Sequence, residues 1–452
     1  MPTSVRAPGP RGTFLLGSLG EFRRDPIGLL TRVTGQYGDV VRLRFGPITA
    51  HVVNHPEYVR QVLEECQKNY DKRTHSVSKM RATCGASLLT EDGSLWLRHR
   101  RLMQPSMMRQ DVERYIPIVT TATKAMLDEW EAAARAVRQL DIVTEMLQLT
   151  LAITARMLFG ADVSNDTEAI ERSLKVILAD TWRRVETVFD LTALSPLFHR
   201  RKFVNAVSRI DEVVYRLIES RRRGTGTADD LLAALLEASD PAEGAGLTDR
   251  ELRDATITML LAGHETSAHA LASTLSLIFR SPVVEERLVR EVHEVLKCRL
   301  PERTDLDRLE YANMTFAEAI RLYPSIWIME RRVVDDDEIG GYAIPAGSML
   351  LISPYVLHRH PRYWRDGGRF DPERFSATQM ADRPRHAYIP FGAGPHQCIG
   401  RFMAPMVARL IVSMIVQRFK LLPVSPETPA MLPGITMRHA GALWMVPVER
   451  NG

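Results

Sequence analysis

Residues 391–400 read Phe391-Gly-Ala-Gly-Pro-His-Gln-Cys398-Ile-Gly400, and this segment decides the fold and the chemistry that we predict. Gly394 and Gly400 allow backbone conformations and close approaches that a side chain would block. We expect Cys398 at the start of a final helix over 399–418, where unpaired N–H groups and the positive helix end favour a thiolate. Because a thiolate is a soft, electron-rich ligand, the segment predicts a metal-binding loop.

Other interpretations of the glycines and cysteines are weaker. The segment 392–397 lacks the last glycine of a G-x-G-x-x-G nucleotide-binding loop, and no strand precedes it. A lone cysteine is usually a small buried hydrophobe, and we expect that role for Cys66, Cys84 and Cys298.

The segment resembles the F-x-x-G-x-x-x-C-x-G haem loop of the cytochrome P450 family, which often has Arg or His at the position of His396. The resemblance implies haem b as cofactor, with Cys398 as the axial thiolate ligand of its iron. It also implies that Phe391, Gly394 and Gly400 are haem-binding positions.

The resemblance covers about residues 37–446. It implies a mainly α fold with small β-sheets, in which a helix-rich part and a β-rich part from the N- and C-terminal regions surround one buried haem. We expect residues 1–36 to form a lead-in and residues 37–452 to form a single haem-thiolate monooxygenase domain.

A second motif contains Glu318 and Arg321, whose i,i+3 spacing places both side chains on one helix face. The later segment 370–375, Phe-Asp-Pro-Glu-Arg-Phe, resembles the family's P-E-R-F sequence. The resemblance implies that Glu318, Arg321 and Arg374 form a buried charge network that fixes the segment before the haem loop. Their role would be structural, because a guanidinium matches a carboxylate and does not readily lose its charge.

A third motif, Ala-Gly-His-Glu-Thr-Ser at 262–267, lies in a predicted helix over 248–280 and resembles the family's A/G-G-x-D/E-T-T/S sequence. Gly263 and the hydroxyl residues weaken a helix, so we expect a local widening there. The resemblance implies that Thr266 bonds to iron-bound oxygen and that Glu265 delivers protons for O–O cleavage.

Two alternatives compete with this interpretation. Without the haem loop, a Glu-Thr pair would more simply be an exposed helix face. A zinc hydrolase motif, H-E-x-x-H, starting at His264 would need histidine at 268, but the chain has Ala268, and His269 comes one residue too late.

A fourth motif, Trp96-Leu-Arg-His-Arg100, resembles the family's W-x-x-x-R sequence. It implies that Trp96 and Arg100 bind a haem propionate, together with His396 and one of Arg331 or Arg332. We favour Arg331 because of its spacing to the acidic run 335–337. Arg98 and Arg101 are expected to be solvated surface residues.

Composition and charge exclude several classes of protein. The 452 residues include 59 basic and 55 acidic side chains, and a formal charge of +4 is too close to balance for a partner that is bulk nucleic acid. The four cysteines form no C-x-x-C pair, which argues against a zinc ribbon or disulfide scaffold. No run approaches the roughly 18 apolar residues of a membrane span, and the N-terminus lacks a signal-peptide core, so we expect a cytoplasmic protein without a membrane anchor.

The pattern of apolar residues and breakers predicts a strand pair over 40–53, followed by a helix capped by Asn54 or His55. Residues 1–37 are rich in Pro and Gly and contain a short apolar segment at 14–16, and we expect this lead-in to pack on the body of the protein. Further elements are predicted as helices over 111–134, 139–159, 203–223 and 248–280, strands over 331–334, 339–344 and 349–352, and a hairpin over 435–445.

The predicted function is that of a haem-thiolate monooxygenase, which inserts one oxygen atom from O2 into a C–H or C=C bond. No flavin or iron–sulfur segment is left over, so electrons from NAD(P)H are expected only indirectly, through separate ferredoxin and ferredoxin reductase. A basic docking face is predicted for the partner, made of Arg98, Arg101, Arg109 and Arg401. A peroxide-driven peroxygenase and a non-catalytic haem-binding or sensor protein remain as alternatives.

The predicted substrate pocket is mostly apolar. It draws on segments 76–89, 182–189, 260–263, 326–328 and 431–435, with Leu261, Ala262, Ile326, Trp327 and Ile328 as candidate lining residues. We therefore expect a small-molecule substrate that is medium to large and hydrophobic, such as a terpenoid, fatty acid or polyketide.

Overall fold

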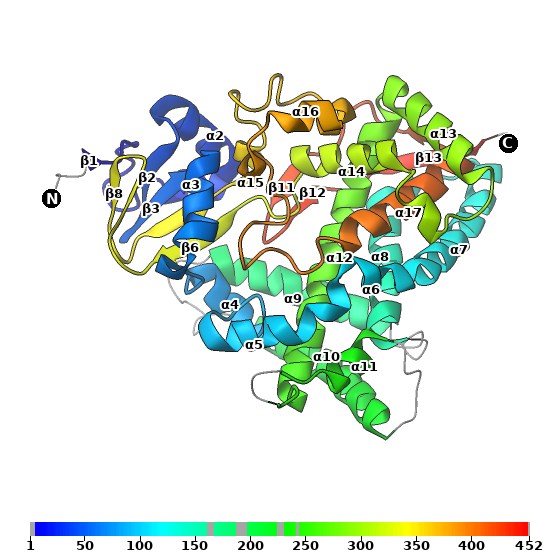
Figure 1. Ribbon diagram of the computed structural model, residues 1–452, viewed down its shortest axis with the longest axis horizontal. Coiled ribbons are helices and arrows are strands. Elements are labelled where there is room, and N and C mark those ends of the chain that lie inside the picture. Colours follow the sequence, from blue (N-terminus) through cyan, green and yellow to red (C-terminus); the bar gives the residue numbers. More distant parts are fainter. Residues whose placement is uncertain (1–4, 161–166, 187–196, 224–229, 241–243, 451–452) are drawn as a thin grey trace. The chain divides into compact units, whose positions relative to one another are not determined.

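A computed structural model of the protein describes residues 5–160, 167–186, 197–223, 230–240 and 244–450 (Figure 1). It contains two compact units, each assembled from two chain segments. Unit 1 comprises residues 1–78 and 318–398, and unit 2 comprises residues 79–317 and 399–452.

Unit 1 holds most of the strands (blue and yellow in Figure 1). Its main sheet has the order β2-β3-β9-β6-β4 and its smaller sheet the order β1-β8-β7. The bounds are β1 Val5–Arg6, β2 Val40–Phe45, β3 Ile48–Val53, β4 Tyr70–Asp71, β6 Met329–Val333, β7 Asp337–Ile339, β8 Tyr342–Ile344 and β9 Met349–Ile352. The predicted strand pair over 40–53 is confirmed, with β2 and β3 antiparallel. The predicted strand over 339–344 is interrupted, because Gly340 and Gly341 make a left-handed turn between β7 and β8.

The helices of unit 1 are short. They are α1 Leu19–Arg24, α2 Pro26–Tyr37, α3 Pro56–Arg60, α15 Pro354–Leu357 and α16 Ala377–Ala381, while α4 His75–Cys84 and α14 Glu310–Leu322 belong partly to each unit. Of the two candidate caps for α3, His55 is the one used, since its side chain accepts a hydrogen bond from the N–H of Glu57.

The core of unit 1 reaches the predicted haem loop. Side chains of β2, β3, β6 and β9 pack in one buried cluster that includes Ile389 and Ala393. The loop 391–398 is therefore fastened to the sheet core by a side chain of its own. The lead-in packs on the body as predicted, since Ala7 belongs to the same cluster. Its apolar segment is the exception, because Phe14 is 92% exposed and Leu15 is 76% exposed.

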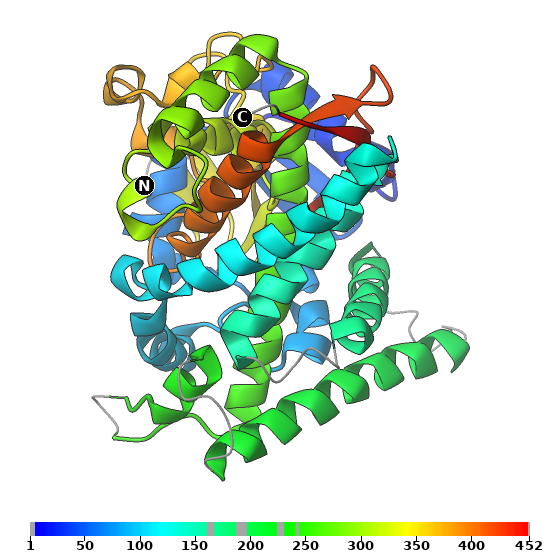
Figure 2. The ribbon, with the colours of Figure 1, turned by 90° about the vertical axis from the view of Figure 1, so that its right-hand side faces the viewer.

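Unit 2 is built on a long helix, α12 (Asp249–Phe279), which begins with a capping box between Thr248 and Glu251. Its helices, seen side-on in Figure 2, are otherwise α5 Gly93–Met103, α6 Arg109–Val112, α7 Ile116–Arg135, α8 Ile142–Phe159, α9 Thr167–Glu186, α10 Leu197–Arg222, α11 Leu231–Glu237, α13 Pro282–Leu296 and α17 Met403–Arg418. α8 packs along α12, and both contribute many buried apolar side chains to the core of the unit.

Helix α8 has the length and composition of a membrane span, contrary to the expectation that no stretch would reach that limit. However, 61% of it is buried inside the structure. Because α8 also packs against α12, it has the environment of a core helix.

The strands of unit 2 are β5 Leu140–Asp141, β10 Phe419–Pro423, β11 Met431–Pro433, β12 Met437–His439 and β13 Trp444–Glu449. The predicted hairpin over 435–445 is wrong in its pairing. β12 pairs with β11, whereas β13 pairs with β10 and β5.

The predicted start of the final helix is also wrong. α17 begins at Met403 rather than at 399, because a proline ring inside a helix clashes with the carbonyl four residues earlier and Pro405 is therefore tolerated only in the first turn. α12 runs without a break over residues 249–279, and at the position of the expected widening the Thr266 hydroxyl donates to the Ala262 carbonyl.

Candidate active site

The loop 391–398 owes its shape to two glycines. Gly392 and Gly394 have φ values of 70° and 68°, in the left-handed region that favours glycine. A Cβ atom on Gly394 would lie 1.9 Å from the carbonyl oxygen of Leu63, so the loop approaches that backbone too closely for any side chain. Gly394 was predicted for this reason, whereas the requirement at Gly392 was missed.

Cys398 ends this loop with an exposed side chain, and its N–H donates to the carbonyl of Phe391 at 2.8 Å. The prediction that Cys398 lies at the N-terminus of the final helix is wrong, because α17 begins five residues later. Any stabilisation of a Cys398 thiolate must therefore come from the loop and a bound metal rather than from the first turn of α17.

The remaining cysteines differ from one another. Cys84 is buried, and burial raises the pKa of its thiol to about 11, so the predicted packing role is confirmed. Cys66 is half-buried, and burial followed by the charge of Asp337 raises its pKa. Cys298 is exposed beyond the end of α13, so its predicted burial is wrong.

The structure brings the charge network together within unit 1. Glu318 and Arg321, on the last turns of α14, are fully buried and joined by two hydrogen bonds of 2.6 and 2.8 Å. Arg374 lies 3.5 Å from the Glu318 carboxylate, which also accepts the Asp371 N–H. Burial raises the pKa of Glu318, while Arg321 opposes that shift.

Arg321 also binds the chain that leads to the haem loop. Its guanidinium donates to the carbonyls of His358, Gly367 and Arg369 at 2.7 to 3.1 Å. A planar group with five donors can satisfy a carboxylate and several carbonyls at once. The i,i+3 pattern indicated the carboxylate partner but not these carbonyls.

His358 is a residue that sequence reasoning missed. Its Nε2 accepts the Ile389 N–H at 2.9 Å, and its Nδ1 lies 3.3 Å from the Arg321 carbonyl. These partners require the neutral tautomer with the proton on Nδ1. Burial, followed by the Arg321 charge, holds the pKa of His358 well below its usual range. The ring therefore connects α14 to the segment just before Phe391.

Strand β6 separates the two candidate propionate ligands of unit 1. Arg332 is held by Asp71 through hydrogen bonds of 3.0 and 2.5 Å. Arg331 projects from the opposite face of the strand, and its guanidinium donates to the Glu330 carbonyl. Arg332 is thus bound to a carboxylate of unit 1, and Arg331 stays the predicted propionate ligand.

In unit 2, α5 presents Trp96 and Arg100 on one face, four residues apart. Both are buried, and Arg100 donates to Gln104 at 2.9 Å. The other face of α5 forms salt bridges with the rest of unit 2: Arg98 binds Glu251 at 2.6 Å and Arg101 binds Asp240 at 2.8 Å.

This arrangement corrects the expectation for Arg98, whose side chain is only 13% exposed. A guanidinium that is nearly buried against a carboxylate offers little charge to a docking partner. Arg109 is exposed but paired with Asp307 and Glu113. Three arginines of the predicted basic docking face, Arg98, Arg101 and Arg109, are therefore largely neutralised by carboxylates of the protein itself.

The centre of α12 holds the acid and the alcohol of the third motif. Glu265 is buried, and its Oε2 accepts a hydrogen bond of 2.8 Å from the Thr436 hydroxyl, just before β12. Burial raises the pKa of Glu265, with the Thr436 bond opposing the shift. The Thr266 hydroxyl donates to the Ala262 carbonyl one turn earlier.

Thr436 and a histidine pair one turn further along α12 were missed by sequence reasoning. His269 and His439 are both buried, with Nδ1 atoms 3.4 Å apart. Burial lowers their pKa values to about 3 and about 4. The only available signal was the i,i+4 spacing of Glu265 and His269, because β12 lies far along the chain.

One face of α12 is open around this motif. Ala262 is exposed and Leu261, Thr266 and Ser267 are half-buried, whereas most of the helix is buried. Leu261 and Ala262 can therefore line a ligand site. Gly263 faces α8, where a Cβ atom would come within 3.2 Å of Thr154.

The candidate lining residues of unit 1 divide into two kinds. Ile326 and Ile328 are half-buried, whereas Trp327 is 2% exposed with its ring facing Phe22. Trp327 is therefore a core residue rather than a lining residue. Of the predicted segment 182–189, residues 187–189 lie outside the described residues.

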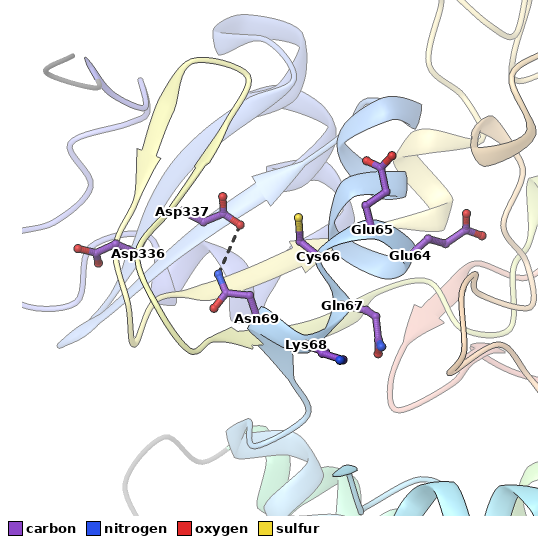
Figure 3. Close-up of a pocket in the computed structure, with 8 residues that line it drawn as sticks. All are labelled: Glu64, Glu65, Cys66, Gln67, Lys68, Asn69, Asp336 and Asp337. Carbon is purple, nitrogen blue, oxygen red and sulfur yellow. Dashed lines mark hydrogen bonds between the residues drawn. The ribbon is translucent and has the colours of Figure 1, made fainter. Parts of the chain in front are cut away.

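Unit 1 also contains a hollow of about 450 Å³, shown in Figure 3. Its lining residues are polar, apart from a half-buried cysteine: Glu64, Glu65, Cys66, Gln67, Lys68, Asn69, Asp336 and Asp337. Asp337 accepts hydrogen bonds from Asn69 and Tyr70. This hollow does not suit an apolar substrate.

Comparison with known proteins places these features in one family. The family model for cytochrome P450 matches residues 7–445. Cyclooctatin synthase of Streptomyces melanosporofaciens is 34% identical, with 98% of this chain and 95% of that protein covered. Pentalenene oxygenase of Streptomyces avermitilis is 30% identical, with 93% and 92% covered. The crystal structure of the cytochrome P450DA heme domain matches with a TM-score of 0.90 at 25% identity, covering 99% of this chain and 98% of that one.

The fold and the site thus define a haem-thiolate oxidoreductase. The chain belongs to the cytochrome P450 family and is a monooxygenase, and the predicted mainly α fold with small β-sheets is confirmed. The loop of unit 1 suits the haem that the family implies, since Cys398 is exposed at its end and its glycines leave no side chain in the way of a close approach.

Proposed function

We propose that the protein oxygenates a cyclic terpenoid, using haem held by Cys398 and electrons from separate ferredoxin and ferredoxin reductase. Three relatives support the substrate class: cyclooctatin synthase, cyclooctat-9-en-7-ol 5-monooxygenase and pentalenene oxygenase. The observation that carries the proposal is the buried Glu265, bonded to Thr436 and next to Thr266 on the open face of α12.

Each group has a defined part in this proposal. Haem with a thiolate ligand supplies the activation of dioxygen when bound. Cys398 provides that ligand, and His396, Arg331, Arg100 and Trp96 hold the propionates, with Phe391, Gly394 and Gly400 shaping the loop. Residues 37–452 act as a single domain around one haem, and the Glu318–Arg321–Arg374 network fixes the segment before the loop.

Proton delivery falls to Glu265 and Thr266. A buried carboxyl with a raised pKa is more readily protonated near neutral pH, so it can donate a proton. Thr436 holds that carboxyl in one orientation, and the Thr266 hydroxyl lies one residue further along the helix. Leu261, Ala262, Ile326 and Ile328 supply apolar contacts to the substrate and exclude water.

The ligand assignment is tested by the absorption spectrum of the reduced, carbon monoxide-treated protein. We expect the red-shifted Soret band of thiolate ligation, its loss in Cys398→Ala, and its retention in Cys298→Ala, which removes another exposed cysteine. A thiolate band that persists in Cys398→Ala would show that another residue is the ligand.

The substrate class is tested by spectral titration with cyclic terpene hydrocarbons and alcohols, with straight-chain fatty acids as the comparison. We expect the terpenoids to bind more tightly and to be oxygenated with NAD(P)H, ferredoxin and ferredoxin reductase. Preference for fatty acids would refute the substrate class but leave the haem assignment intact. Turnover with hydrogen peroxide alone would instead favour the peroxygenase, and binding without turnover would favour the sensor.

A further inference from the structure

The turn formed by residues 13–17 in unit 1 presents three consecutive apolar side chains to solvent. Phe14, Leu15 and Leu16 are 92%, 76% and 44% exposed. Single exposed apolar residues are ordinary on a protein surface, but a contiguous group at the tip of a turn points to a binding role.

The backbone of this turn is held firmly. Thr13 and Gly17 exchange two hydrogen bonds of 2.9 Å, and the N–H of Gly46 donates to the Leu16 carbonyl at 3.1 Å. The Arg44 guanidinium donates to the carbonyls of Thr13 and Phe14. The fold therefore satisfies the polar groups of the turn while leaving its apolar side chains uncovered.

The chain segment that carries the turn is positively charged. Residues 1–47 contain seven arginines and three carboxylates, a surplus of four that equals the formal charge of the whole chain. The carboxylates are all occupied: Glu21 pairs with Arg32, Asp25 caps α2, and Asp39 binds His360. Arg11 and Arg24, which lie near the turn in sequence, are exposed.

We propose that the 13–17 turn inserts into the surface of a membrane that contains anionic lipids. Apolar side chains flanked by arginines combine the two contributions that drive interfacial binding, which are burial of apolar area and attraction to anionic headgroups. Three side chains are too few for a stable protein interface, which buries about 800 Å² on each partner. A lipid surface is also where an apolar substrate concentrates.

The test uses the haem-loaded full chain and sedimentation with vesicles. We expect binding to vesicles of equal parts phosphatidylcholine and phosphatidylglycerol, weaker binding to phosphatidylcholine alone, and a decrease with added salt. Phe14→Ser/Leu15→Ser should weaken the partition about tenfold or more. The control Val283→Ser, which removes an 80% exposed apolar residue of unit 2, should leave it unchanged.

A second measurement locates the contact. A Leu15→Trp variant should show a blue shift of tryptophan fluorescence with the mixed vesicles beyond that of the wild type. Equal binding of the Phe14→Ser/Leu15→Ser variant, or no binding of the wild type, would overturn the proposal. A wild-type dimer in the absence of lipid that this variant converts to a monomer would assign the turn to a second copy instead. The inference does not rest on the proposed substrate, since each readout is independent of turnover.

Discussion

At the scale of single residues, the haem loop offers a matched pair of glycines. Both Gly392 and Gly394 have positive φ, but a Cβ on Gly392 would only come within 3.7 Å of the Met329 sulfur. Gly392→Ala should therefore cost about 1 kcal/mol for the backbone conformation alone. Gly394→Ala adds the collision with the Leu63 carbonyl, and we expect it to abolish the thiolate band after carbon monoxide treatment. Retention of the band in Gly394→Ala would contradict the close approach seen in the structure.

Thr436 gives a second prediction at this scale. Thr436→Val removes the hydroxyl that donates to Glu265, so the pKa of that buried carboxyl should rise further. We expect more peroxide and less product per NAD(P)H, and an activity profile displaced to higher pH. Thr436→Ser keeps the hydroxyl and is the control. An unchanged ratio of product to NAD(P)H in Thr436→Val would show that Thr436 does not position Glu265.

The sequence could predict those site residues that belong to a short motif or whose partners lie close to them in the chain. The Glu318–Arg321 contact follows from helical spacing. The bond from Thr436 to Glu265 and the bond from Ile389 to His358 join residues 171 and 31 positions apart. No local pattern encodes such distances, because the packing of whole elements brings these partners together.

At the scale of elements, Arg253 connects three parts of unit 2. From α12, it donates to Asp211 on α10 at 2.7 Å, to the Thr83 carbonyl at the end of α4 at 3.0 Å, and to Asp254 at 2.8 Å. Asp254 in turn accepts the Ala86 N–H at 2.9 Å. The segment after α4, predicted to contribute to the substrate pocket, is thus fixed to α12 by buried charges.

Removing this connection should release the segment. Arg253→Met leaves two carboxylates without their partner, and loss of one member of a buried pair costs about 3–5 kcal/mol. We expect faster amide hydrogen exchange over residues 79–92 and a lower free energy of unfolding. Arg290→Met, which breaks an exposed pair with Glu286, should change neither beyond about 0.5 kcal/mol. Equal exchange in the two variants would show that Arg253 does not fix the segment.

The boundaries of α12 and α17 show where a sequence pattern predicts an element well and where it does not. Apolar periodicity predicted α12 within one residue at each end, and the structure adds that a capping box of Thr248 and Glu251 fixes its N-terminus. The start of α17 was placed too early because periodicity alone ignores the constraint that Pro405 imposes. The pairing of β13 with β10 depends on the packing of the whole unit, and the strand pattern in the sequence does not predict which strands pair.

At the scale of the whole molecule, both units bury neutral imidazoles. Burial lowers the pKa to about 4 for His51 in unit 1 and for His439 in unit 2. The unfolded chain takes up a proton on each ring below about pH 6.5, whereas the folded protein does not. The stability linked to these groups is therefore fully present above pH 6.5 and is lost as the pH falls towards 4.

This linkage predicts the effect of His51→Asn. Between pH 6.5 and 4, the free energy of unfolding of the wild type should fall by about 3 kcal/mol more than that of the variant. Measuring this difference by urea unfolding at matched pH removes the contributions of groups that the two proteins share. His293→Asn, at an exposed position, is the control. A difference that does not vary with pH would mean that His51 is not held neutral by the fold.

The capping box of α12 has a consequence for the order of folding. Glu251 caps its own helix and also binds Arg98 and His99 of α5, so its pKa falls to about 2 although burial opposes the charge. The cap is local and closes quickly, whereas docking α5 closes a loop of 153 residues at an entropic cost. We infer that the N-terminus of α12 forms early as a nucleation point and that α5 is recruited to it late.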